Sequence, residues 1–161
     1  IKGCGGIDLL LLGIGPQGQI GFNQPGSFVN TKTRLVVLNN NSMAAISDGF
    51  RNDEEVPSKA ITMGIDTIMN AKSIIMTAWG EDKAAIVGNI VEGDITGDRP
   101  ASYLQEHDNI ELVIDETAAQ ELTRVKTPWL VGTCDWQPKF IRKAVAWLCG
   151  KVGKPILKLS Y

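Results

Sequence analysis

The stretch that decides the fold runs Asp8-Leu9-Leu10-Leu11-Leu12-Gly13-Ile14-Gly15-Pro16-Gln17-Gly18-Gln19-Ile20-Gly21-Phe22-Asn23-Gln24-Pro25-Gly26-Ser27. It continues an apolar run, Ile7–Leu12, which only Asp8 interrupts and which Gly13 ends. An apolar run without alternation is typical of a strand covered on both faces, as in a parallel sheet. The glycine-dense part therefore predicts an irregular loop at the carboxyl end of a buried strand, where α/β sheets bind ligands.

Further apolar runs of strand length follow, and helical patterns separate several of them. The expected strands are Leu35–Leu38, Ala60–Met63, Ile74–Ala78, Ile110–Ile114 and a short last one at Pro155–Leu159. The expected helices are Glu81–Val91, Glu116–Leu122 with Asp115 as its cap, and one that begins at Pro138 and stops at Gly150 or Gly153. The alternation predicts a doubly wound α/β fold, with a mostly parallel Rossmann-like sheet and helices on both faces.

Two more expectations concern polar and apolar residues. We expect the last helix to bury one face, made of Phe140, Ile141, Ala144, Val145 and Leu148. Asn39–Asn41 has the composition of a polar loop.

The composition excludes several classes of protein. The chain has 161 residues, with 16 Lys and Arg against 18 Asp and Glu, so its net charge is -2. It lacks the basic excess typical of a nucleic-acid binder, and no apolar run approaches the roughly 18 residues that cross a bilayer. We therefore expect neither a nucleic-acid partner nor a membrane partner. The three cysteines form no C-x-x-C pair, which predicts inert thiols in a reducing cytoplasm and no metal site.

The loop Gly13-Ile14-Gly15-Pro16-Gln17-Gly18 fits the G-x-G-x-x-G pattern of dinucleotide-binding turns. That function needs a helix that opens at the loop and receives the pyrophosphate on its N-terminus. Two glycines and a proline lie within residues 21–26, which argues against such a helix. The acidic residue expected about 20 positions further on is also missing. A dinucleotide oxidoreductase is therefore disfavoured, and no cofactor is expected.

The whole stretch resembles the signature of the glucosamine-6-phosphate deaminase (isomerase) family, roughly G-x-G-x-D-G-H-I-x-F-N-E-P-x-S. Further resemblances follow in the same order, in Thr31-Lys32-Thr33-Arg34 (S-x-T-R), residues 60–64 (A-L-T-V-G), residues 90–93 (A-V-E-G) and residues 102–107 (S-x-L-Q-x-H). The resemblance implies opening and isomerisation of a glucosamine 6-phosphate ring with release of ammonia, by acid–base chemistry without a metal. Gln17, Gln19 and Gln24 stand where the family has its proton-transfer Asp, His and Glu. Because a carboxamide exchanges no proton near neutral pH, we expect the chain to be impaired or inactive as a deaminase. The alternative is a non-catalytic hexose-phosphate-binding or regulatory protein.

The resemblance also assigns contacts for a sugar phosphate. Lys83 aligns with the family's phosphate-binding lysine, whereas Asp48 stands near the position of a phosphate-binding arginine. Gly15, Gly18 and Asn23 are expected to contact the sugar. Ser27 and Arg34 match an inter-subunit effector site of some bacterial members, but Val36 stands where that site has a lysine. A surface salt bridge is the preferred interpretation of Arg34.

The resemblance extends from about residue 7 to 127. We therefore expect residues 1–127 to be the C-terminal portion of a deaminase-like domain, and residues 128–161 to be a helical extension packed on it. The phosphate-cradling loop of the family's first half is absent, so we expect that the chain is a fragment, or that the other half is disordered, cleaved or supplied by another chain. A homo-oligomer is expected. The single histidine, His107, is expected to be structural, and Trp147 to belong to a core or subunit contact.

Overall fold

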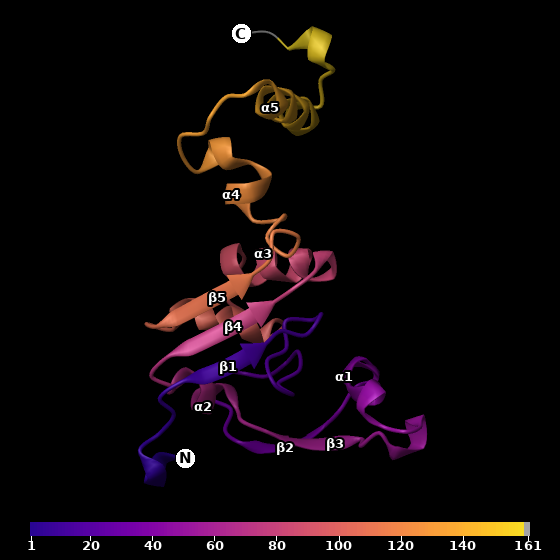
Figure 1. Cartoon of the computed structure of the whole chain (residues 1–161), viewed down its shortest axis with the longest axis vertical. Coiled ribbons are helices and arrows are strands. Elements are labelled where there is room, and N and C mark those ends of the chain that lie inside the picture. The colour runs from indigo at the N-terminus through magenta and orange to yellow at the C-terminus, as the bar shows by residue number, and fades with distance from the viewer. Residues whose placement is uncertain (160–161) are drawn as a thin grey trace.

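A computed structural model of the chain describes residues 1–159, apart from the side chains of Lys2 and Asp53. Its centre is a three-stranded parallel sheet in the order β1-β4-β5, made of β1 (Leu10–Gly13), β4 (Ile74–Ala78) and β5 (Ile110–Ile114) (Figure 1). Leu10 is in register with Ile74, which is in register with Ile110. The three strands predicted from apolar runs at these places are confirmed, and β4 and β5 have the predicted bounds.

Two other predicted strands form a separate sheet. β2 (Arg34–Val37) and β3 (Lys59–Thr62) pair antiparallel, and we call them the β2–β3 ribbon. The prediction that they belong to the parallel sheet is wrong. The ribbon extends away from the central sheet (Figure 1). Its Leu35 and Ile61 are 63% and 75% exposed. Their apolar character therefore does not reflect burial in this structure.

Helices and turns cover one face of the parallel sheet. α2 (Ile65–Met69), α3 (Ala84–Glu92) and the 3-10 segment Pro100–Glu106 contribute buried side chains to one core. The core includes the fully buried Ile65, Ile74 and Val87. The opposite face exposes Leu9, Leu11 and Val113, so the expected helices on both faces are not found within residues 1–159.

A short helix, α1 (Asn40–Ile46), follows β2. The expectation of a polar loop at Asn39–Asn41 is wrong, because Asn39 acts as a helix N-cap. Its side-chain oxygen accepts a hydrogen bond from Ser42 N at 2.9 Å. Asparagine is among the residues most preferred at this position.

The chain ends in a segment that we call the tail, residues 122–159. It contains α4 (Thr123–Lys126) and α5 (Pro138–Val152), and Figure 1 shows it extending beyond the sheet along the long axis of the molecule. α5 begins at Pro138 as predicted, and Gly153 ends it in the left-handed conformation at φ 65°. The described part of α5 has no buried residue, so its predicted buried face is wrong for this chain. The packing of residues 128–161 on the domain stays a prediction.

Two smaller expectations are corrected. Residues 116–122 form turns in place of a helix, although Asp115 does accept the capping hydrogen bond from Ala118 N at 2.9 Å. Residues 156–158 form a 3-10 turn where a last strand was expected. None of the helices described by the structure is long and apolar enough to cross a membrane.

Candidate functional site

The candidate site lies at one edge of the parallel sheet. Because β1, β4 and β5 run in the same direction, the loops that follow Gly13, Ala78 and Ile114 emerge together. A hydrogen bond joins two of these loops, since Gly80 N donates to Asp115 Oδ1 at 3.1 Å. The structure thus places the glycine-dense loop where open α/β sheets bind ligands.

The glycine-dense loop folds back on itself directly after β1. Gly15 N donates to the Gln19 carbonyl oxygen at 3.0 Å, and Gly18 N donates to the Gly15 carbonyl oxygen at 3.0 Å. Gly18 has a φ of +75°, a conformation that favours glycine. Residues 14–23 contain turns and one isolated bridge and no helix. The pyrophosphate-binding helix of a dinucleotide site is therefore missing at this loop, as the sequence predicts.

Gly15 and Gln19 are in close contact. A Cβ atom added to Gly15 would lie 2.2 Å from the side-chain carbon Cδ of Gln19, so any other residue here would displace that carboxamide. Gln19 is buried, and its Oε1 accepts a hydrogen bond from Gln17 N at 2.8 Å. Gln17 in turn accepts from Asn39 Nδ2, at a longer distance of 3.5 Å.

Gln24 uses both ends of its carboxamide. Its Nε2 donates to the Val37 carbonyl oxygen at 2.7 Å. Its Oε1 accepts from Asn39 N at 2.8 Å and from Ser42 Oγ at 3.4 Å. The structure therefore brings Gln17 and Gln24 together through Asn39. Sequence reasoning missed Asn39 and Ser42, although the pattern of a helix N-cap before the residues of α1 could have pointed to them.

A cavity of about 330 Å³ opens beside these glutamines. Every lining residue is uncharged: Gly13, Ile14, Gly15, Gln19, Gly21, Phe22, Ser42, Ala45 and Ile46. Such a lining offers hydrogen bonds and apolar contacts to a ligand, but no proton donor or acceptor that titrates near neutral pH. No group of His, Cys, Asp and Glu within the described residues could hold a metal ion.

Asn23, predicted to contact sugar, is fully buried and serves the protein itself. Its Nδ2 donates to the Met63 carbonyl oxygen at 2.7 Å and to the Ile20 carbonyl oxygen at 3.0 Å, while its Oδ1 accepts from Arg34 Nη1 at 2.8 Å. Arg34 also donates to Ser27 Oγ at 3.0 Å. The structure therefore brings the two predicted effector residues together. The salt bridge preferred for Arg34 is not found among the described residues, because its partners are neutral.

Lys83 lies in the loop that follows β4, in a 3-10 turn just before α3. Its Nζ is 3.1 Å from Asp82 Oδ2, and its side chain is 22% exposed. It is not one of the residues that line the cavity beside Gln19. The structure therefore puts Lys83 at the expected edge of the sheet, already paired with a carboxylate.

Asp115 organises the third loop at this edge. The hydrogen bond from Ala118 N, helped by those from Thr117 Oγ1 and Gly80 N, holds the pKa of the Asp115 carboxyl below its ordinary value. A carboxyl with a lowered pKa stays ionised at neutral pH, so it fixes the loop and supplies no proton.

His107 joins two elements away from the cavity. Its Nε2 lies 2.9 Å from the Ala71 carbonyl oxygen, and its Nδ1 accepts from Asn109 N at 3.1 Å. These partners fit a neutral imidazole protonated on Nε2, and they match the structural role expected for this residue.

Comparison with known proteins identifies the family. The model of the glucosamine-6-phosphate isomerases and 6-phosphogluconolactonases matches residues 2–114. A putative glucosamine-6-phosphate deaminase-like protein of Bacteroides thetaiotaomicron is 51% identical over 160 residues, which are 99% of this chain and 24% of that protein. A glucosamine-6-phosphate deaminase of Pediococcus pentosaceus is 46% identical over 117 residues, which are 73% of this chain and 50% of the relative.

A solved structure of a monomeric glucosamine-6-phosphate deaminase matches with a TM-score of 0.72 at 41% identity, over 74% of this chain and 50% of that one. The 6-phosphogluconolactonase of Trypanosoma cruzi, 19% identical with a TM-score of 0.56, shares the fold. This chain thus spans about half the length of the deaminases it matches. The family model and the structural match at 41% identity together establish that the chain belongs to the glucosamine-6-phosphate isomerase/6-phosphogluconolactonase family.

Proposed function

We propose that this chain contributes a hexose-phosphate-binding site whose glycine-dense loop does not carry out the deamination typical of its relatives. The observation that carries the proposal is the bonding of Gln24. Its carboxamide donates to Val37 and accepts from Asn39, so the surroundings of this side chain need a donor and an acceptor together. A carboxylate, which only accepts when ionised, does not meet both needs.

The other two family acid–base positions support the same interpretation. Gln19 is buried against Gly15, and Gln17 is bonded through its own backbone nitrogen to Gln19. General acid–base catalysis requires a group that gains and loses a proton near the working pH, and a carboxamide is not such a group. We infer that the loop retains the shape of a sugar site and lacks its proton relay.

The phosphate group of the ligand would lie against Lys83 and the backbone amides at the sheet edge. Lys83 is partly buried and faces a single carboxylate, Asp82, which an incoming phosphate would displace. Gly15 is half-buried and lines the cavity beside Gln19, where a sugar ring would lie. Gly18 is buried beside Arg99 and Ile86 and does not line that cavity. The net charge of the chain is -2, so the chain as a whole does not attract an anionic ligand electrostatically.

The proposal extends to the setting of the protein. The three free cysteines, Cys4, Cys134 and Cys149, fit a reducing cytoplasm, where sugar phosphates are metabolised. We also propose that the protein works as a homo-oligomer. Ser27 and Arg34, which hydrogen-bond to each other, stand where an effector would be held between subunits of bacterial relatives, and we retain an effector site there as a proposal.

Titration calorimetry with glucosamine 6-phosphate tests the binding. We expect binding by the chain as given, and a loss of about 10- to 150-fold in affinity for Lys83→Ala, since a charge-assisted contact to phosphate contributes about 1.5–3 kcal/mol. Lys59→Ala, which removes an exposed lysine on β3, is the matched control and should bind as the parent does. Equal affinity of the parent and Lys83→Ala would rule out the phosphate role of Lys83.

An assay of ammonia release from glucosamine 6-phosphate tests the proposed absence of deamination. We expect no release above the uncatalysed rate. Turnover comparable to that of ordinary enzymes, on the order of 10 per second, would show that acid–base groups outside the glutamine loop have taken over the chemistry.

A further inference from the structure

The side chain of Arg99 has a role that the site described above does not explain. Arg99 is half-buried, and its Nε is buried without a hydrogen-bond acceptor among the described residues. In the same part of the chain, no carboxylate forms an ion pair with its guanidinium. An arginine is always charged and carries five N–H donors, so a buried nitrogen without an acceptor costs free energy. An anion that supplies the acceptor would remove this cost.

Arg99 lies directly against the glycine-dense loop. A Cβ atom added to Gly18 would be 3.1 Å from Arg99 Cβ and 3.3 Å from Arg99 Cα. The same added atom would be 3.2 Å from Ile86 Cδ1, which belongs to the first turn of α3. The loop, α3 and the base of the Arg99 side chain therefore meet at one place.

Backbone hydrogen bonds hold Arg99 in this position. After it in the chain, Ala101 N donates to the Gly18 carbonyl oxygen at 2.8 Å. Before it, the Gly97 carbonyl oxygen accepts from Gly26 N at 2.9 Å. The segment that carries Arg99 is thus fastened to the glycine-dense loop on both sides. A side chain on such a fixed backbone is preorganised for binding, because less conformational freedom remains to be lost.

The same loop connects Arg99 to the cavity of the site. Gly15 lines the cavity, and its carbonyl oxygen accepts a hydrogen bond from Gly18 N at 3.0 Å. Gly18 in turn packs against Arg99. A single turn of the loop therefore separates the cavity from Arg99.

The second cation near this place is Lys83. It lies in the 3-10 turn that leads into α3, three residues before Ile86. Residues three apart on a helix are neighbours on its surface, so Lys83 and Arg99 lie at the same end of α3. The two cations differ in their partners. Lys83 pairs with Asp82 at 3.1 Å, whereas Arg99 has no carboxylate partner in the part of the chain that the structure describes.

We propose that Arg99 binds the phosphate group of the hexose phosphate, as a second cation beside Lys83. This inference rests on the proposed function, since it adds a residue to the same site. A guanidinium presents paired N–H donors that match two oxygens of a phosphate. The phosphate also supplies the acceptor that the buried Nε lacks. Arg99 positions the ligand and transfers no proton, because an arginine stays protonated.

A phosphate fits this place better than a single carboxylate of another protein segment does. A phosphate monoester carries a charge of about −1.5 to −2 at pH 7, which balances both cations. The side chain of Asp82 is 72% exposed, so it can turn into water when a phosphate takes its place at Lys83. A single carboxylate at Arg99 would leave the charge of the whole cluster no better matched than Asp82 already leaves that of Lys83.

Titration calorimetry of the whole chain with glucosamine 6-phosphate tests the proposal. We expect Arg99→Gln to weaken binding by about 10- to 150-fold, the range for loss of a charge-assisted hydrogen bond. Arg99→Lys keeps the charge and loses the paired donors, so it should lose less affinity. Arg142→Gln, which removes an exposed arginine of α5, is the matched control and should bind as the parent does.

The pH dependence of binding distinguishes a phosphate contact from support of the loop. A phosphate monoester gains its second negative charge near pH 6, so the parent should bind more tightly at about pH 7.5 than at about pH 5. In Arg99→Gln this difference should shrink, because one of the two cations that attract the added charge is missing. An equal loss of affinity at the two pH values would overturn the proposal and assign Arg99 a structural role.

The stability of the ligand-free chain provides a second test. Because Arg99 Nε has no acceptor there, Arg99→Gln should leave the melting temperature within about 2 °C of that of the parent. Glucosamine 6-phosphate should then raise the melting temperature of the parent more than that of the variant. A variant that is much less stable than the parent without ligand would overturn the binding role in favour of a structural one.

The outcomes separate this inference from the proposed function. If Lys83→Ala loses affinity and Arg99→Gln does not, the proposed site stands and the role of Arg99 is overturned. If Arg99→Gln loses affinity and Lys83→Ala does not, the role of Arg99 is supported and that of Lys83 falls. A parent chain that does not bind glucosamine 6-phosphate would overturn both.

Discussion

Gln24 Nε2 lies 2.7 Å from the carbonyl oxygen of Val37, the last residue of β2, so an amide hydrogen must stand between these two atoms. The oxygen of the same carboxamide accepts from Asn39 N. The Gln24 side chain thus ties the glycine-dense loop to the ribbon and to α1. Its replacement by an acidic residue is the first prediction.

Gln24→Glu should destabilise the fold by about 1–3 kcal/mol at neutral pH, because the ionised carboxylate would face the Val37 carbonyl oxygen without a hydrogen between them. The loss should shrink as the pH falls and the new carboxyl takes up a proton. Urea unfolding of parent and variant from neutral to acidic pH measures both effects. Gln17→Glu is the control, since Gln17 Oε1 only accepts, from Asn39, and a carboxylate can do the same.

Asn23→Ala should cost about 1–3 kcal/mol of unfolding free energy, because it removes three hydrogen bonds of a fully buried side chain, two to the Met63 and Ile20 carbonyl oxygens and one from Arg34 Nη1. Urea unfolding measures the loss. Asn41→Ala, at an exposed asparagine of α1, should change stability by less than about 0.5 kcal/mol. A loss of unfolding free energy in Asn23→Ala as small as that in Asn41→Ala would contradict the structural role of the Asn23 hydrogen bonds.

Gly64→Ala should be strongly destabilising, by about 1–3 kcal/mol, because an added Cβ would lie 2.1 Å from the Thr31 carbonyl oxygen and the backbone would have to move. Thermal unfolding of Gly64→Ala is compared with that of Gly132→Ala, in which the added Cβ meets no atom within 4 Å. The difference between the two variants measures the destabilisation that the steric clash causes. Comparable melting temperatures for the two variants would contradict the close approach of residues 31 and 64.

Asp115 should make stability depend on pH in the acid range. Hydrogen bonds from Ala118 and Thr117 lower the pKa of its carboxyl below the ordinary 3.8, so the folded state binds this proton less readily than the unfolded state. Its contribution is therefore complete above about pH 4 and is lost as the pH falls through the lowered value. In Asp115→Asn this part of the acid dependence should be absent, which unfolding curves at a series of pH values would show. A variant with the parent's acid profile would contradict the assignment.

The sequence predicts the parallel sheet well, because β4 and β5 are short, apolar and bounded by turn residues. It predicts the loop after β1 for a similar reason, since glycine and proline exclude a helix there whatever the surroundings. The sequence does not predict the separate ribbon, because Leu35 and Ile61 have the apolar character of a core strand and yet are exposed in this chain. Periodicity cannot distinguish a strand that the chain buries from one whose partner lies outside it.

The sequence indicates candidate site residues, whose roles stay predictions, and it does not indicate the partners of those residues. The resemblance pointed to Gln17, Gln19 and Gln24, but it did not indicate that Asn39 connects two of them. Arg34 was assigned a salt bridge because arginines on surfaces often form one, whereas its partners here are a buried amide and a hydroxyl. Such pairings depend on tertiary structure, since Arg34 and Asn23 are 11 residues apart in the sequence.

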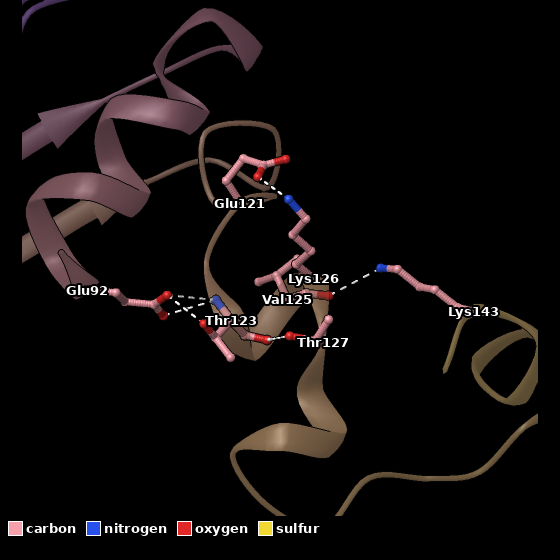
Figure 2. A network of polar contacts seen from close by, with 7 residues as sticks. All are labelled: Glu92, Glu121, Thr123, Val125, Lys126, Thr127 and Lys143. Carbon is pink, nitrogen blue, oxygen red and sulfur yellow. Dashed lines mark hydrogen bonds and ion pairs between the residues drawn. The ribbon is translucent and has the colours of Figure 1, made fainter. Parts of the chain in front are cut away.

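Glu92 is the last residue of α3, and both of its carboxylate oxygens accept hydrogen bonds from Thr123 (Figure 2). A negative charge at a helix C-terminus is unfavourable unless donors surround it. Truncation before Thr123 would therefore loosen the end of α3 as well as release the tail. Shortened versions made for crystallisation should end after Lys126, so that the last turn of α3 keeps its donors.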